Sequence, residues 1–143
     1  MSFERLSRGF RRRVAERARW RCEYCLSPAA FCTQPFEVDH IIPRSKGGRG
    51  AADNLALSCG CNSYKGQRTR ARDPQTGRFA SLFHPRRQRW ARHFAWSDDF
   101  LLIRGRTATG RATVEALQLN RPQVVSLRNL LYLIGEHPPI RRD

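Results

Sequence analysis

Two closely spaced cysteine pairs are the first residues of this 143-residue chain whose type and spacing suggest chemistry. Cys22 and Cys25 form a C-x-x-C pair, and Cys59 and Cys61 form a tighter C-x-C pair. Four thiolates suit a tetrahedral Zn²⁺ ion, and such a site adds free energy directly to folding. The spacing is not that of a common zinc ribbon, so the ion would fix the two ends of a long insertion. We expect these four cysteines to bind structural zinc.

Three other interpretations of the cysteines stay open. A redox-active C-x-x-C pair usually lies near a βαβ pattern, which this sequence does not show. The fifth cysteine, Cys32, could replace Cys59 or Cys61 as a ligand. The C-x-C pair could also be degenerate, because its single intervening residue restricts the geometry. Free cysteine often behaves as a small buried hydrophobe, and we expect that role for Cys32.

Polar residues between the two pairs could carry hydrolytic chemistry. Residues 36–43 predict a strand that ends at a proline. Unless the strand bends there, Val38 and His40 lie on one face and Asp39 on the other. Histidine titrates near ~6.5, so it can take a proton from water at neutral pH. Asp39 and Asn62 offer the oxygen ligands that Mg²⁺ and Mn²⁺ prefer. Each residue alone has an ordinary structural explanation, but their order inside the cysteine frame indicates a site.

This order of residues resembles the HNH endonuclease family over residues 21–66. The motifs that carry the resemblance are Asp39-His40-Ile41-Ile42-Pro43, Asn54-Leu55 and Cys61-Asn62-x-x-Lys65-Gly66. A weaker resemblance to a stand-alone bacterial branch extends through Asp73-Pro74-x-Thr76-Gly77, Leu82-Phe83-His84-Pro85-Arg86 and Gly110-Arg111-Ala112-Thr113-Val114. The chain departs from the family at its second cysteine pair, which is normally C-x-x-C.

The resemblance implies a role for each matching residue. The family's fold is a ββα-metal module, in which a hairpin and a helix surround one catalytic divalent cation. Asp39 and Asn62 would bind this Mg²⁺ or Mn²⁺ ion, and His40 would be the general base. Asn54 would brace the loop through its side-chain amide, and Lys65 would contact phosphate or support the site.

The charge of the chain favours a polyanionic partner. Lys+Arg number 27 and Asp+Glu 12, which gives a net charge of +15. Nearly all the basic residues are arginine, whose planar fork suits phosphate, although a G·C-rich genome would also enrich arginine. We expect DNA as the partner, with RNA as an alternative. The basic residues that we expect to contact nucleic acid are Arg11, Arg12, Arg44, Lys46, Arg49, Lys65, Arg68 and Arg70.

The sequence gives no sign of a membrane or secreted protein. Its apolar stretches are far shorter than the roughly 18 residues that a membrane span needs. The first residues lack the apolar core of a signal peptide. We therefore expect a cytoplasmic protein with no membrane partner.

Periodicity and turn residues predict the elements around the site. Apolar spacing predicts an amphipathic helix over residues 3–18, and residues 66–85 are basic and turn-rich. The later elements are a short helix at 87–94, a hairpin of 94–96 with 100–103, a helix at 109–119, and a helix from Pro122 with a cap at Gly135.

These elements predict an α+β fold with a small zinc-stabilised ββα-metal (HNH/His-Me finger) core, flanking helices and a C-terminal hairpin plus helices. The expected divisions are a basic helix at 1–20, the zinc-framed nuclease core at 21–70 and an extension packed on it at 71–143. Trp20, Trp90 and Trp96 should anchor the core.

The predicted function is metal-dependent hydrolysis of phosphodiester bonds in DNA. The alternative is a zinc-containing module that binds DNA or RNA without cleaving it. A toxin or mobile-element nuclease would share the chemistry and differ in genetic neighbourhood. His84, His93 and His137 lack a comparable frame and are expected to be structural or surface residues. His84, which precedes a proline, is the first candidate for an exception.

Overall fold

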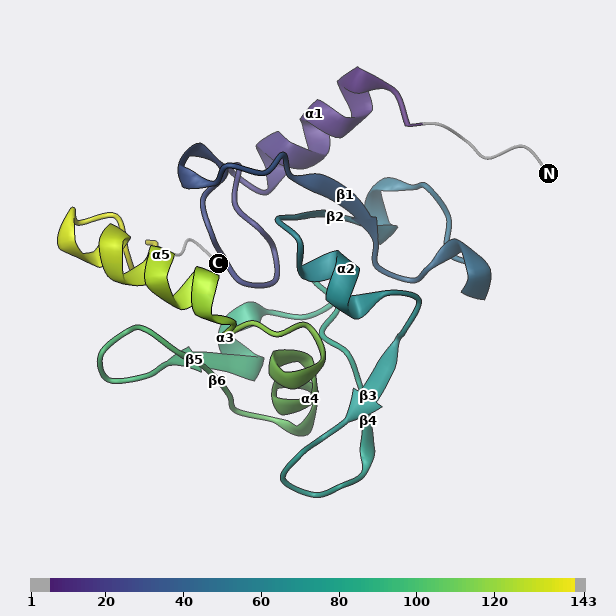
Figure 1. Ribbon diagram of the computed structural model, residues 1–143. Coiled ribbons are helices and arrows are strands. Elements are labelled where there is room, and N and C mark those ends of the chain that lie inside the picture. Colours follow the sequence, from purple (N-terminus) through teal and green to yellow (C-terminus); the bar gives the residue numbers. More distant parts are fainter. Residues whose placement is uncertain (1–5, 141–143) are drawn as a thin grey trace.

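The computed structural model describes residues 6–140, which combine helices with small antiparallel hairpins (Figure 1). The helices are α1 (Arg8–Arg17), α2 (Cys61–Lys65), α3 (Trp90–His93), α4 (Ala108–Ala116) and α5 (Pro122–Leu133). The paired strands are β1 (Glu37–His40) with β2 (Leu55–Ser58), β3 (Arg70–Arg72) with β4 (Phe79–Ser81), and β5 (Phe94–Trp96) with β6 (Ile103–Gly105). Short 3-10 turns are η1 (Ala29–Phe31), η2 (Arg44–Lys46) and η3 (Ala52–Asn54). This mixture confirms the predicted α+β class.

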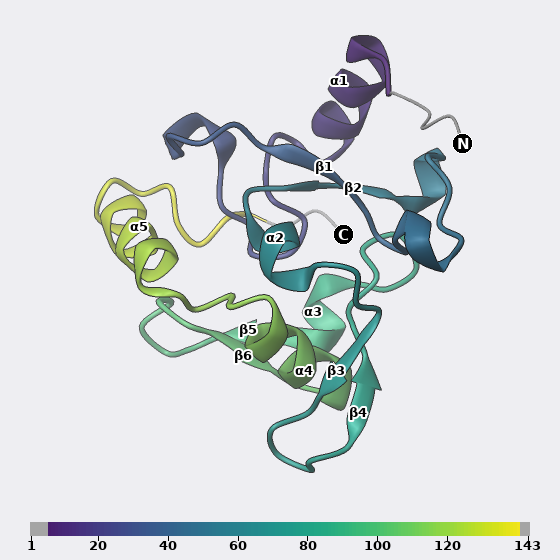
Figure 2. The ribbon, with the colours of Figure 1, turned by 45° about the vertical axis from the view of Figure 1, so that its right-hand side comes forward.

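The β1–β2 hairpin lies between α1 and α2, an arrangement that both ribbon views show (Figures 1 and 2). In its register, Asp39 lies opposite Ala56 and His40 lies opposite Leu55. Strand side chains alternate between faces, so Asp39 reaches Lys65 of α2 while Val38 packs among the apolar residues under α1. The predicted alternation of Val38 and Asp39 is confirmed.

Helix α1 packs on the hairpin through a narrow apolar face. Val14 and Ala15 are buried in a cluster with residues of β2. Ser7 caps the helix, because its Oγ accepts a hydrogen bond from the Phe10 N–H at 3.1 Å. The helix predicted over residues 3–18 is therefore shorter, and its predicted first turn falls partly in residues 1–5, outside the described part of the chain.

The β3–β4 hairpin lies in the segment that the sequence predicts only as turn-rich. Its connecting turn is built by Asp73, whose carboxylate accepts hydrogen bonds from the Gln75 N–H and the Thr76 hydroxyl. Arg111 of α4 binds the same carboxylate with two nitrogens, both at 2.9 Å. The turn residues therefore connect two paired strands and do not form an irregular loop, and Arg111 ties α4 to this turn.

The later elements follow the prediction with shifted ends. Helix α3 is a single turn instead of residues 87–94, and the second strand of the β5–β6 hairpin begins at Ile103. Helix α4 starts after Thr107, whose Oγ1 accepts a hydrogen bond from the Gly110 N–H. Helix α5 begins at Pro122 as predicted, and Gly135, with φ at +79°, follows its end.

One apolar core joins the cysteine region to the C-terminal elements. Tyr24 and Ala56 belong to the same buried cluster as Phe83, Trp90 and Leu117. Trp90 and Trp96 are in ring contact at 5.4 Å, as expected of core anchors. Trp20 is 51% exposed, so its prediction as a core residue is wrong. It lies just after α1, where the chain turns through positive φ angles at the surface. No helix among residues 6–140 is long and apolar enough to span a membrane.

Replacing Asp73 with asparagine is expected to lower the melting temperature at neutral pH. Hydrogen bonds from Arg111 hold the pKa of Asp73 below its usual range. The carboxylate therefore contributes stability above the usual aspartate pKa of about 3.9, and this contribution is lost as the pH falls further. Melting curves of the wild type and Asp73→Asn should converge in acid. Asp98→Asn, at an exposed position, is the matched control. A pH-independent difference would contradict the prediction.

Candidate active site and metal centre

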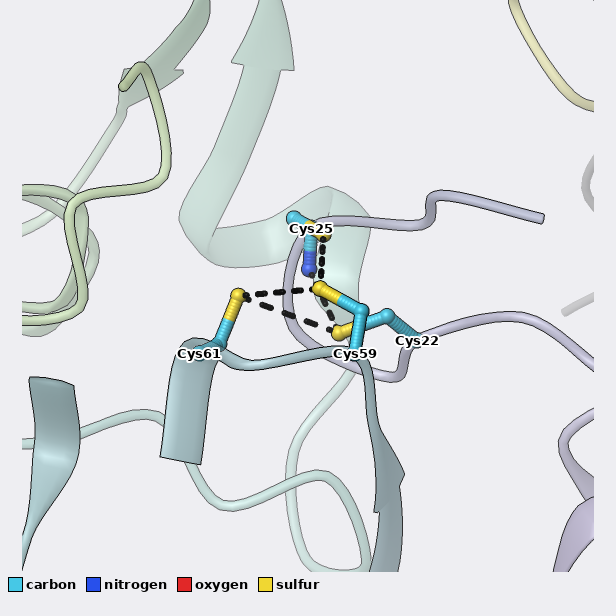
Figure 3. A group of neighbouring side chains, drawn as sticks. All are labelled: Cys22, Cys25, Cys59 and Cys61. Atoms are coloured by element: carbon cyan, nitrogen blue, oxygen red, sulfur yellow. Dashed lines mark hydrogen bonds between the residues drawn. The ribbon is translucent and has the colours of Figure 1, made fainter. Parts of the chain in front are cut away.

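The two cysteine pairs form one buried cluster (Figure 3). Cys22 and Cys25 lie in the turn after α1, while Cys59 and Cys61 lie where β2 passes into α2. All four Sγ atoms are within 4.8 Å of one another. The distances are 3.9 Å between Cys22 and Cys61, 3.4 Å between Cys25 and Cys59, and 3.7 Å between Cys59 and Cys61. Zn–S bonds of about 2.3 Å in a tetrahedron give S–S edges of about 3.8 Å. The cluster could therefore hold zinc, and the single residue inside the C-x-C pair does not prevent it.

Cys32 lies outside this cluster. Its thiol donates to the Pro28 carbonyl at 3.3 Å, and burial raises the pKa of Cys32 to about 11. A thiol with this pKa stays protonated at neutral pH, in contrast to a zinc ligand. The structure thus favours Cys59 and Cys61 over Cys32 as partners of the first pair.

Arg121 faces the cluster from the segment before α5. Its guanidinium donates to Cys59 Sγ at 3.4 Å and to Cys61 Sγ at 3.5 Å. Four thiolates around Zn²⁺ carry a net charge of −2, and a guanidinium beside them offsets part of it. The sequence gives no local signal for this contact, because 60 residues separate Arg121 from Cys61.

Asp39 is held by two buried partners. The Tyr24 hydroxyl donates to Asp39 Oδ2 at 2.6 Å, and Lys65 Nζ lies 3.2 Å from the same oxygen. Burial, followed by the Asp39 charge, raises the pKa of Tyr24 well above its usual value, so the phenol keeps its proton. Asp39 Oδ1 accepts no hydrogen bond from the residues that the structure describes. This oxygen is available to a cation.

Lys65 connects α2 to the end of β1. Its side chain is 1% exposed, and Nζ also donates to the His40 carbonyl at 3.1 Å. This burial and these two contacts fit one of the two predicted roles of Lys65, that of supporting the site, which stays a prediction. The other predicted role, direct contact with a phosphate, does not fit this burial. The prediction of Lys65 as a nucleic-acid contact is corrected accordingly.

His40 is the last residue of β1, and its ring is half-buried. Arg44 Nε donates to His40 Nε2 at 3.2 Å. Burial, followed by the charge of Arg44, lowers the pKa of His40. The ring is therefore neutral at neutral pH, with Nε2 as the nitrogen that can accept a proton.

Asn54 ties the ends of the loop that follows β1. Its Oδ1 accepts the Ile42 N–H at 2.8 Å, and its Nδ2 donates to the Ile42 carbonyl at 3.0 Å and the Arg49 carbonyl at 2.9 Å. Three hydrogen bonds from one buried amide fix the backbone two residues beyond His40. These are the contacts that a loop brace would make.

Asn62 lies on the face of α2 that meets β1. Residues three apart share a helix face, so Asn62 and Lys65 both turn toward the hairpin. Lys65 meets Asp39, whereas Asn62 Nδ2 donates to Glu37 Oε2 at 2.9 Å. Asn62 Oδ1 accepts a hydrogen bond from the Ser58 hydroxyl at 3.4 Å, and Asp39 and Asn62 share no direct hydrogen bond in the described part of the chain. Neither Glu37 nor Tyr24 is among the site residues that the sequence predicts.

The other predicted nucleic-acid contacts are exposed. Arg12 forms a surface ion pair with Glu16 at 3.0 Å, and Arg68 donates to carbonyls of Tyr64 and Ala116. The exposed members of the predicted set are Arg11, Arg12, Arg44, Lys46, Arg49, Arg68 and Arg70. Arg44 and Lys46 of η2 and Arg49 in the loop after it lie close to His40 in the chain.

Replacing Lys65 with methionine is expected to destabilise the protein by about 3–5 kcal/mol, because it leaves the Asp39 carboxylate buried without its countercharge. Urea denaturation in buffer without Mg²⁺ measures this loss. Lys46→Met is a matched control, since Lys46 is the other lysine and is exposed in η2. Its effect should stay within about 0.5 kcal/mol. Equal stability of the two variants would show that the Asp39–Lys65 pair contributes nothing.

Comparison with known families supports the predicted resemblance. Residues 22–68 match the family model described as HNH endonuclease. This segment contains the four clustered cysteines, the Asp39-His40 pair, Asn54, Asn62 and Lys65. A search of curated proteins found no match, and a search of solved structures found none.

Proposed function

We propose that this HNH domain is a metal-dependent endonuclease that hydrolyses phosphodiester bonds in DNA. The observation that carries the proposal is the position of Asp39 and His40 at the end of β1, with α2 held against Asp39 by Lys65. The four-cysteine cluster fixes the start of α2. A module that only binds nucleic acid has no need of a buried carboxylate with one oxygen left open beside a neutral histidine.

His40 acts as the general base in this proposal. Its Nε2 takes a proton from the attacking water, and the hydrogen bond from Arg44 must first be released. Arg44 is exposed, so its guanidinium can turn to a substrate phosphate as the strand binds. Lys65 and Asn54 hold the backbone on either side of the ring.

Asp39 and Asn62 would hold the catalytic divalent cation. Tyr24 and Lys65 both bind Asp39 Oδ2, which orients the carboxylate and leaves Oδ1 without a hydrogen bond from the described residues. The donor set consists of hard oxygen atoms, which fits Mg²⁺ or Mn²⁺. When bound, the ion supplies charge neutralisation at the phosphate and the leaving oxygen.

The four cysteines would hold a structural zinc ion away from the reaction. Their sulfur atoms have the separations of a tetrahedral site, and Arg121 offsets its charge. Cys61 begins α2, and Cys25 directly follows Tyr24. The zinc site thereby positions both the helix that carries Asn62 and the phenol that orients Asp39.

DNA binding is expected to weaken steeply as salt rises. The net charge is +15, and the exposed arginines around α1 and η2 can neutralise phosphates. Each neutralised phosphate should lower log K by ~0.9 per unit of log salt concentration. Fluorescence anisotropy with a labelled duplex, recorded with Ca²⁺ in place of Mg²⁺, measures the slope. An affinity that does not change with salt would contradict this prediction.

Incubation of supercoiled plasmid with the purified protein tests the proposed function. Nicked or linear plasmid should form with Mg²⁺ or Mn²⁺ and should not form with excess EDTA. Binding without cleavage under every divalent ion would favour the alternative, a non-catalytic nucleic-acid-binding module.

A further inference from the structure

A second group of polar side chains surrounds a cavity beside the candidate active site. The cavity has a volume of about 420 Å³ and lies between the residues that follow β1 and the segment that connects β4 to α3. Figure 2 shows this segment rising from β4 toward the hairpin. Ile41 and Ile42, which directly follow His40, line one wall, and Phe83, His84 and Arg87 line another. The cavity therefore begins one residue beyond His40 in the chain, and Lys65, which binds Asp39, also lines it.

His84 has a buried nitrogen without a partner in this structure. Its ring Nδ1 accepts a hydrogen bond from the Arg86 backbone N–H at 3.2 Å, and its backbone N–H donates to Gln88 Oε1 at 2.9 Å. The bond at Nδ1 orients the ring, whereas Nε2 is buried and has no hydrogen bond with the described residues. Burial, followed by the charge of Arg87, lowers the pKa of His84. A neutral ring that accepts at Nδ1 carries its proton at Nε2, so the His84 ring in the cavity wall holds an unsatisfied donor.

Two cations share the cavity with this donor. The side chains of Lys46 and Arg87 form no hydrogen bond or ion pair with the described residues. Lys65 also borders the cavity, but Asp39 neutralises it. Burial and the charge of Arg87 lower the pKa of His84, whereas the negative charge of Asp53 raises it. Two free cations and one N–H donor therefore outweigh one carboxylate.

We propose that this cavity is a binding site for a backbone phosphate of the nucleic-acid strand, adjacent to the phosphate that is cleaved. Identifying the ligand as a nucleic-acid strand depends on the proposed function; the anion site itself does not. An imidazole N–H, a guanidinium and an ammonium are the donors that recognise phosphate oxygens. A phosphate would satisfy His84 Nε2 once the ring turns this buried nitrogen toward the cavity, and the volume leaves room for the attached sugar. The C-terminal extension would then hold the strand in register with His40.

The test follows histidine ring-proton NMR signals while inorganic phosphate is added at constant ionic strength. The protein is full-length and carries His40→Ala, so that no DNA is cut. The His84 signal, identified by its loss in His84→Gln, should shift and saturate, while the His93 and His137 signals stay unchanged. Arg87→Ala should weaken phosphate binding about tenfold, as expected for a charged hydrogen bond. Arg104→Ala removes an exposed arginine outside the cavity and should leave the affinity for phosphate unchanged.

A short single-stranded DNA oligonucleotide then competes with phosphate for the same signal. Competition supports a backbone-phosphate site, whereas phosphate binding without competition would show a free-anion site and overturn the proposal. An unchanging His84 signal would also overturn it. Because this test measures no cleavage, a responsive His84 signal together with a wild-type protein that fails to cut plasmid would refute the proposed function and leave the anion site intact. Plasmid cleavage by the wild type together with an unchanging His84 signal would support the proposed function and refute the anion site.

Discussion

The His40→Ala protein is expected to cleave DNA roughly 10²–10⁴-fold more slowly than the wild type, the range that general-base catalysis contributes. The substitution removes the proton acceptor but no proposed metal ligand. His40 is half-buried at the end of a strand, and the hydrogen bonds that fix its backbone come from Lys65 and from the Asn54 brace beside it. The fold, zinc content and DNA affinity should therefore persist. Single-turnover cleavage of a labelled duplex measures the rate, and the same duplex with Ca²⁺ measures the affinity.

His93→Ala is the matched control for this comparison. His93 is also partly buried, but its ring hydrogen-bonds Thr107 at the start of α4, away from β1. Its loss should leave the cleavage rate close to that of the wild type. Loss of DNA affinity in His40→Ala alone would indicate that His40 binds substrate instead of activating water.

The Cys22→Ser protein is expected to lose zinc and cooperative unfolding together. Structural zinc contributes an apparent free energy of about 10–16 kcal/mol, which equals or exceeds the whole stability of a typical domain, about 5–15 kcal/mol. Cys22 is fully buried, so a water molecule from solvent cannot readily take the place of the lost thiolate at the zinc ion. Elemental analysis should find about one zinc per chain in the wild type and much less in the variant.

Cys32→Ser separates zinc loss from thiol loss. Cys32 is a free thiol outside the cluster, so this variant should keep its zinc and its sharp melting transition. If Cys22→Ser instead melted as cooperatively as Cys32→Ser, the four-cysteine cluster would not be a structural metal site.

The cysteine frame and the order of the site residues could be predicted from the sequence because their signals are local. Two short cysteine spacings point to the four thiols that cluster, and strand alternation separates Val38 from Asp39. The burial of Lys65 could not be predicted, since a lysine at the end of a short helix is ordinarily exposed. It depends on Asp39, which lies on a different element and is brought opposite Lys65 by the packing of α2.

The missed contacts all join residues that are far apart in the chain. The sequence shows Tyr24 only as an aromatic residue between Cys22 and Cys25. Its contact with Asp39 depends on how this cysteine turn packs against β1. Arg121 meets the cysteines only after the C-terminal extension folds back. The β3–β4 hairpin was missed for another reason, because strands of three residues are too short to show periodicity.

The most direct test of the account is the rate at which supercoiled plasmid is nicked by the wild type and by His40→Ala in the same Mg²⁺ buffer. Both proteins should first show equal zinc content and equal melting temperature. The account predicts nicking by the wild type, complete inhibition by EDTA, and almost no nicking by His40→Ala. Equal nicking by a folded His40→Ala protein would remove His40 from the reaction and contradict the proposed active site.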